Sequence, residues 1–226
     1  KTHEQAQYPR RCQRLAVSAD GQWVAAGFFD LGSGGGYGPR LRQFNESAVV
    51  ILDAKTGKEA GRCRTFQARQ LAISDDGSRC FVLDNEDYEQ GRAPWNVHNG
   101  FVLAAFDRQG KEIFHVPATN SAGFASSGNG KLALLAFNDL SGFVTVMDVD
   151  GKRGTHVEYP RMDLGIAAAP DGSFGVISYA DGLVRQVGPD GRILKDTPMG
   201  VPGVPIILPD KSILVCANDG KVYPLD

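Results

Sequence analysis

Residues 71–77 read Leu-Ala-Ile-Ser-Asp-Asp-Gly, an apolar stretch that runs into a tight Asp-Gly turn, and this pattern recurs along the chain. The turns of the five copies are Asp20-Gly21, Asp76-Gly77, Asn129-Gly130, Asp171-Gly172 and Asp210-Lys211. Asn or Asp followed by Gly accepts the positive φ angles of a short hairpin loop, so each turn predicts two antiparallel strands. Hairpins at a regular spacing indicate repeated units that stack to bury a shared core.

A second turn and further β-rich segments complete the first four units. The segments that precede this second turn are 49–52, 101–104, 143–146 and 183–187. The fifth unit contains three predicted strands, whereas each complete unit contains four. No segment has the apolar spacing that a helix of ten or more residues requires.

The chain is therefore predicted to be all-β, a five-bladed β-propeller with four-stranded antiparallel blades in a single domain. The expected blades are 15–70, 71–120, 121–163, 164–203, and 204–226 together with 1–14. Residues 4–14 enter the first unit much as 59–70 enter the second, so they are predicted to supply the missing strand of the last blade. Sharing one blade between the termini removes open sheet edges. The alternative is that the chain is a fragment of a longer propeller.

The turns also carry a resemblance to known propellers. The hydrophobic-Ser-x-Asp-Gly turns resemble those of WD-repeat, YVTN-type and quinoprotein-like propellers. Residues 50–59, Val-Ile-Leu-Asp-Ala-Lys-Thr-Gly-Lys-Glu, are similar to the turn between the third and fourth strands of the last two families. The chain lacks the Gly-His and Trp-Asp dipeptides of WD repeats and the docking tryptophan that follows this turn in quinoproteins. The resemblance thus implies a propeller fold but no bound quinone.

Composition and charge indicate an ordinary globular chain. Hydrophobic residues make up 42% of the chain and charged residues 22%. The formal net charge is −2, which does not indicate any class of partner. One group of arginines lies in segments predicted to be outer strands: Arg10, Arg11, Arg14, Arg62, Arg64 and Arg69. Charged edge strands resist pairing with other chains, which is the favoured interpretation. A basic rim for an acidic partner is the alternative, and nucleic acid is disfavoured as that partner.

The cysteines indicate neither a disulfide framework nor a zinc site. Cys12, Cys63, Cys80 and Cys216 fall in different units at non-equivalent positions, without a C-x-x-C motif. Four unpaired thiols slightly favour a cytoplasmic location over a periplasmic or secreted one. No apolar run is long enough to span a bilayer, and no secretory signal is recognised.

Two long insertions are the strongest functional signal. Residues 30–47 and 84–99 follow the second strands of units one and two, and these loops are expected on the same face of adjacent blades. Long loops on a rigid scaffold commonly carry binding sites. Aromatic and arginine side chains are typical contact anchors. The candidate binding residues are Tyr37, Arg40, Arg42, Tyr88, Arg92, Trp95 and His98. The alternative is that these loops pack against the propeller itself.

An acidic residue marks the end of each second strand. These residues are Asp30, Asp84, Asp139, Asp181 and Asp219. In a radial arrangement they form a ring at one end of the channel, where carboxylates can hold a hard cation such as calcium. Asp is also a favoured turn residue because its side chain binds the local backbone, and this turn role is the preferred interpretation. No other cofactor is predicted.

The sequence offers no catalytic set. The predicted first strands contain no acid to act beside a glycosidic bond, and no Ser-His-Asp or Cys-His set can be argued from spacing. We therefore expect a non-catalytic protein-binding or scaffolding propeller whose partner is another protein or another domain. The alternative is a ligand- or sugar-binding or hydrolytic propeller with a cation at the channel mouth.

Overall fold

The protein is all-β throughout the part of the chain that the computed structural model describes, which is residues 10–30, 48–65, 68–85, 101–118, 121–137, 143–148, 153–158 and 165–225. Every regular element in these ranges is a strand, and strands β1 to β19 form five antiparallel sheets. The predicted fold class is therefore confirmed at this level. Within the same ranges, no helix is long and apolar enough to cross a membrane.

Each sheet is a meander in which strands pair in chain order. The first sheet contains β1 (Arg10–Val17), β2 (Trp23–Asp30), β3 (Ala48–Asp53) and β4 (Glu59–Arg64). The second contains β5 (Ala68–Ile73), β6 (Arg79–Asn85), β7 (Phe101–Asp107) and β8 (Glu112–Pro117). The third contains β9 (Ser121–Ser126), β10 (Leu132–Phe137), β11 (Phe143–Asp148) and β12 (Arg153–Glu158).

The last two sheets follow the same order. The fourth contains β13 (Gly165–Ala168), β14 (Gly175–Ser178), β15 (Leu183–Val187) and β16 (Ile193–Pro198). The fifth contains β17 (Gly203–Ile207), β18 (Ile213–Ala217) and β19 (Val222–Leu225). The predicted first, second and third strands of all five units, and the fourth strands of units one to four, are thus found as strands.

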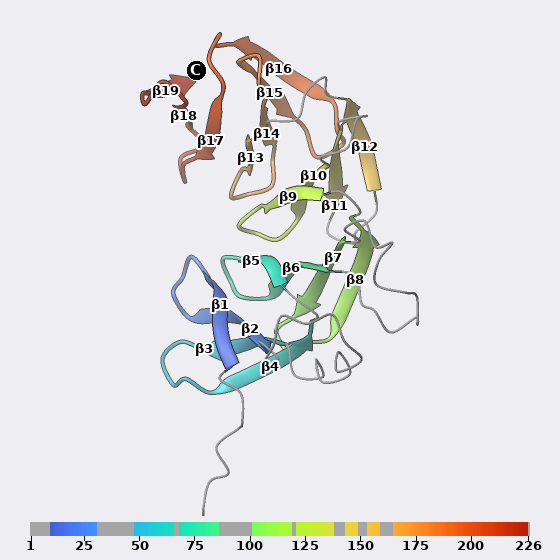
Figure 1. Ribbon diagram of the computed structural model, residues 1–226. Helices are drawn as coiled ribbons and strands as arrows, with labels where there is room; N and C mark the ends of the chain where they lie inside the picture. The colour runs from blue at the N-terminus through green and yellow to red at the C-terminus, as the bar shows by residue number, and fades with distance from the viewer. Residues whose placement is uncertain are drawn as a thin grey trace, which may run out of the picture.

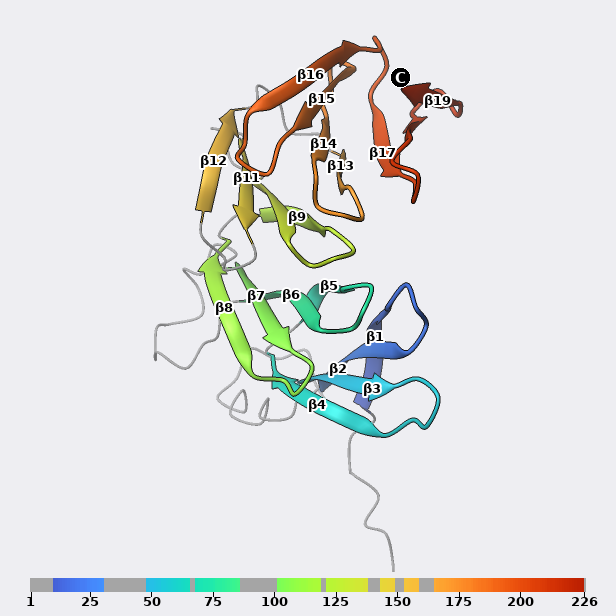
Figure 2. The same ribbon diagram turned by 180° about the vertical axis from the view of Figure 1, so that it is seen from behind.

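The five sheets succeed one another along an arc, with β1 at one end and β17 to β19 at the other (Figures 1 and 2). The first strands of neighbouring sheets lie against each other: β1 on β5, β5 on β9, β9 on β13 and β13 on β17. An apolar layer fills each space between consecutive sheets. The core is therefore a series of layers between sheets, as expected for stacked repeats.

Buried serines organise the tight turns. The Ser127 hydroxyl donates to Asn129 Oδ1 at 2.8 Å and accepts from the Leu132 amide at 2.9 Å. Ser18 and Ser74 occupy the same place in the first two units and make the same pair of contacts. These bonds satisfy backbone groups that the hairpin leaves without partners. The repeated Ser-x-Asp/Asn pattern therefore has a structural cause.

The N-terminal segment differs from the prediction. Residues 10–14, expected in a fourth strand of the last blade, continue β1 instead and pair with β2. The pairing shifts register between Cys12 and Arg14, as it does between Ala68 and Gln70 in β5, so the first strand extends past a bulge. The rest of the predicted closing strand lies outside the described residues. Within the described part of the chain, the fifth sheet has three strands and no sheet is closed.

The same extension changes the interpretation of the arginines. Arg10, Arg11 and Arg14 lie in β1, and Arg69 lies in β5, so these four belong to first strands rather than to outer strands. Arg62 is in the outer strand β4, where it binds Glu59 through two hydrogen bonds of 2.8 and 3.0 Å. The predicted basic rim is therefore divided between inner and outer strands.

Candidate binding face

The two long insertions leave neighbouring sheets at equivalent hairpin ends. Strands β2 and β3 pair up to Phe28 opposite Ala48, and β6 and β7 pair up to Asn85 opposite Phe101. In the fourth sheet a tight turn at 180–182 closes the equivalent hairpin. Because the first and second sheets pack side by side, both insertions begin at the same edge of adjacent sheets. We call this edge of the molecule the loop face.

The predicted binding residues lie within the insertions themselves, outside the described residues. They are Tyr37, Arg40, Arg42, Tyr88, Arg92, Trp95 and His98. The structure places the strand ends from which these segments leave. Their assignment as contact residues stays a prediction.

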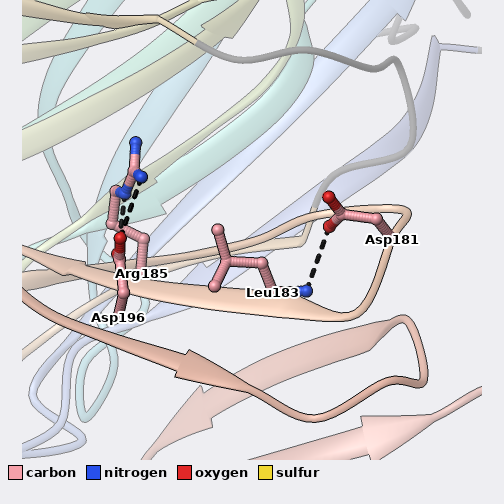
Figure 3. Close-up of polar contacts among 4 residues, drawn as sticks. All are labelled: Asp181, Leu183, Arg185 and Asp196. Atoms are coloured by element: carbon pink, nitrogen blue, oxygen red, sulfur yellow. Dashed lines mark hydrogen bonds and ion pairs between the residues drawn. The ribbon is translucent and has the colours of Figure 1, made fainter.

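The predicted acidic ring has three members with described side chains, Asp84, Asp181 and Asp219. Asp139 and the side chain of Asp30 lie outside the described part. Asp84 is buried within β6 at 9% exposure. In the turn at 180–182, Asp181 Oδ1 accepts the Leu183 amide at 3.1 Å, and the carboxylate stays over its own hairpin (Figure 3).

Asp219 also binds groups of its own hairpin. Its carboxylate accepts the Tyr223 hydroxyl at 2.6 Å and the Lys221 amide at 3.0 Å, and these two bonds hold the pKa of Asp219 below its ordinary value. Asp181 and Asp219 therefore perform the turn role that the sequence favours for such residues. Within the described residues, no three His, Cys, Asp or Glu side chains gather as a metal would require.

The fourth sheet contains a polar pair that the sequence does not predict. Arg185 of β15 binds Asp196 of β16 through two hydrogen bonds of 2.8 and 3.0 Å (Figure 3), and its guanidinium lies 5.4 Å from the centroid of the buried Tyr179 ring. The Arg185 guanidinium holds the pKa of the Asp196 carboxyl below its ordinary value. Such a bidentate pair fixes two strands in register.

A β-bulge, which the sequence does not reveal, brings Arg185 and Asp196 together. Counting outward from a regular turn places Arg185 opposite Lys195, a repulsive neighbour. The register instead shifts between Gln186 and Val187, and Asp196 then comes to lie opposite Arg185. Equivalent shifts occur between third and fourth strands in the first three sheets. The repeated bulge was not visible in the hydrophobic pattern.

The edge opposite the loop face carries the first turn of every unit, and its polar groups join one sheet to the next. The Arg108 guanidinium lies 4.1 Å from the centroid of the Trp23 ring and donates to the Asp76 carbonyl at 2.7 Å. The Asp20 amide donates to the Asp75 carbonyl of the second sheet at 3.4 Å. Burial, and then the nearby Asp76 and Asp20 carboxylates, raise the pKa of Asp75.

The chain of turn contacts continues through the last three sheets. The Asn129 amide donates to the Pro170 carbonyl at 2.8 Å, and Lys211 Nζ lies 2.6 Å from the Asp171 carboxylate. The bonds from Lys211 and Ser173 hold the pKa of Asp171 well below its ordinary range. Much of the polar chemistry at this edge is therefore used between sheets.

No protein-family model matches the chain, and no curated protein matches it either.

Proposed function

We propose that the chain is a closed five-bladed β-propeller that acts as a non-catalytic protein-binding or scaffolding module through its loop face. One observation carries the functional part: the insertions 30–47 and 84–99 begin at equivalent hairpin ends of two adjacent sheets. Binding residues are found disproportionately often on loops that a rigid scaffold positions. Their Tyr, Trp and Arg side chains suit protein contacts.

Ring closure is supported by the way in which consecutive sheets pack. In the second sheet, Leu71 and Ile73 of β5 pack against the first sheet. Their counterparts in β1, Leu15 and Val17, are 67% and 60% exposed, and no sheet of the described residues packs on that side of β1. A first strand that presents large apolar side chains to water needs a cover.

The other end of the arc presents the matching surface. Ala16 of β1 faces the following sheet and packs in the apolar layer with Ile73. Ile206 of β17 is the counterpart of Ala16, and with Val204 it is exposed, at 43% and 56%. In sheets one to four this side packs against the next sheet, whereas in the fifth sheet it is exposed. The first sheet exposes the opposite side, which in sheets two to five packs against the preceding sheet. Packing these two sides together completes the ring with the same kind of layer.

A double-mutant cycle tests ring closure. Val17→Ala and Ile206→Ala are expected to couple by about 1 kcal/mol, because contacting residues are not additive. The free energy of unfolding of all four proteins, measured in urea at two protein concentrations, gives the coupling. A coupling that does not change with concentration comes from one chain. Val17→Ala with Ile113→Ala on β8 is the control, since Ile113 is 40% exposed on a distant outer strand. Additivity of both pairs would show that the two ends do not meet.

Loss of one insertion is expected to abolish partner binding. A variant whose residues 84–99 are replaced by Asn-Asp-Gly, the kind of turn that closes the equivalent hairpin of the fifth sheet, keeps β7 and residues 79–83 of β6 but lacks Tyr88, Arg92 and Trp95. Affinity capture from the native source, followed by mass spectrometry, should retain a protein with the wild-type chain and lose it with the variant. Lys55→Ala, in an exposed turn at the other edge, is the control and should retain the same protein.

The purified partner then separates binding from the cation alternative. Trp95→Ala is expected to weaken binding at least about tenfold, as truncation of a central aromatic contact does. Asp181→Asn and Asp219→Asn should leave the affinity unchanged, since both carboxylates serve their own turns. Loss of binding with the two Asp variants and not with Trp95→Ala would instead favour a cation-dependent site.

A further inference from the structure

Two of the four cysteines lie on the sheet faces that ring closure brings together. Cys12 of β1 and Cys216 of β18 are exposed free thiols, whereas Cys63 and Cys80 are buried. Cys12 pairs with Phe28 on the side of the first sheet that carries Leu15 and Val17. Cys216 pairs with Val204 on the outer side of the fifth sheet. Each thiol therefore belongs to one end of the arc.

The strand registers identify the counterpart of Cys216. Counted outward from the first turn, the fourth residue pair is Arg14–Gly27 in the first sheet and Val204–Cys216 in the fifth. Cys216 thus occupies the place in the fifth sheet that Gly27 occupies in the first. Gly27 lies on the side of its sheet that faces the second sheet.

The counterpart of Cys12 follows from the shared bulge. The fifth pair is Cys12–Phe28 in the first sheet and Ala68–Asp84 in the second, and both follow a register shift. Ala68 is packed into the layer between these two sheets. Cys12 thus occupies in the first sheet the place that Ala68 occupies in the second.

The Cβ–Cβ distance between these two counterpart positions suits a disulfide. A Cβ atom built on Gly27 lies 3.6 Å from the Cβ atom of Ala68. Disulfide-bonded cysteines have Cβ atoms roughly 3.5–4.5 Å apart. If the fifth sheet packs on the first as the first packs on the second, Cys216 and Cys12 take these two positions.

We propose that Cys12 and Cys216 form a disulfide that locks the first sheet to the last, an inference that rests on the ring closure proposed above. The reaction uses a low-molecular-weight disulfide such as oxidised glutathione. One protein thiolate attacks it and releases one glutathione thiol, and the second protein thiolate then attacks the mixed disulfide and releases the other. The two protein sulfurs are oxidised, the glutathione disulfide is reduced to two thiols, and the two protein protons go to these products.

The two buried cysteines do not compete for this reaction. Cys63 and Cys80 lie in the layer between the first and second sheets. Burial, and then the nearby Asp107 carboxylate, raise the pKa of the Cys63 thiol to about 12, and burial raises that of Cys80 further. Thiols in this state are neither ionised nor accessible at neutral pH. Selectivity for Cys12 and Cys216 therefore follows from position.

The test is oxidation of the folded, reduced protein with oxidised glutathione at low protein concentration. After alkylation, peptide mass spectrometry should find Cys12 joined to Cys216, non-reducing electrophoresis should show a monomer, and the urea midpoint should shift upward. Cys12→Ser and Cys216→Ser should each abolish the linkage and the shift. A linkage between two chains, or separate glutathione adducts on both cysteines, would overturn the proposal.

The double-mutant cycle separates failure of the disulfide from failure of ring closure. It is repeated in a Cys12→Ser/Cys216→Ser background, in which no linkage forms. If Val17 and Ile206 are coupled in this background but the wild type forms no disulfide, ring closure is supported and the disulfide is rejected. Absence of coupling together with absence of the disulfide rejects both.

Discussion

Replacing Gly61 with valine is expected to lower the free energy of unfolding by about 3 kcal/mol or more, the upper range for overpacking a well-packed site. Valine is the better strand former, so local propensity alone predicts the opposite change. A Cβ atom on Gly61, however, lies 2.3 Å from the Arg108 carbonyl oxygen and 2.3 Å from the Gln109 carbonyl carbon. Both contacts are with backbone, which cannot turn aside as a flexible side chain can.

The contact at Gly61 is reciprocal, which explains the size of the effect. A Cβ atom on Gly110 lies 2.3 Å from the Arg62 carbonyl oxygen, so the outer strand of the first sheet rests directly on a turn of the second. That turn is held by Arg108, which reaches the Asp76 and Gly77 carbonyls. Relief of the clash therefore has to move an anchored loop.

Urea unfolding at constant slope measures this prediction, with Ala60→Val as the matched control. Ala60 is an exposed neighbour in the same strand and lies at its bulge, so adding the same side chain there should change stability by less than about 0.5 kcal/mol. If Gly61→Val and Ala60→Val behave alike, the two sheets do not make the close backbone contact described here.

Leu134→Ala is expected to cost about 3–4 kcal/mol, within the range for deleting a fully buried leucine. Leu134 is 0% exposed in the layer between the third and fourth sheets. Its side chain packs onto Gly175 of β14, where a Cβ atom would lie 2.6 Å from Leu134 Cδ1. Gly175 has no side chain that can fill the space that leucine vacates, so the cavity should persist.

A second substitution should partly rescue this loss. Gly175→Ala alone is expected to destabilise the protein, because its new methyl group meets Leu134. In the Leu134→Ala background the same methyl group occupies the cavity, so the double variant should be more stable than the sum of the single effects by at least about 1 kcal/mol. Leu194→Ala, at a position 56% exposed on β16, is the control for leucine truncation and should cost less than about 0.5 kcal/mol. Additivity of Leu134→Ala and Gly175→Ala would mean that the two residues do not share this space.

Local sequence was sufficient to identify the strands and their turns. An apolar run followed by Ser-x-Asp-Gly predicts a hairpin because the glycine takes the positive φ and the serine and aspartate bind the turn backbone, and the structure has both features at Ser74, Asp76 and Gly77. The turn role of Asp181 and Asp219 follows from the same short-range chemistry. These interactions lie within a few residues, so a single sequence contains them.

Register and packing between sheets were decided by tertiary structure. The bulge that follows Cys12 moves residues 10–14 into β1, and the bulge beside Gln186 brings Asp196 opposite Arg185; neither interrupts the hydrophobic pattern. Cys12 and Cys216 fall in different units at non-equivalent positions, so their spacing along the chain does not relate them. The proposal that they meet rests on how closely Gly27 approaches Ala68, because this approach shows how the first sheet packs on the second. The sequence by itself determined the repeated hairpins, because local backbone chemistry sets them, while the strand pairing and the faces that pack together depend on contacts between residues far apart in the chain.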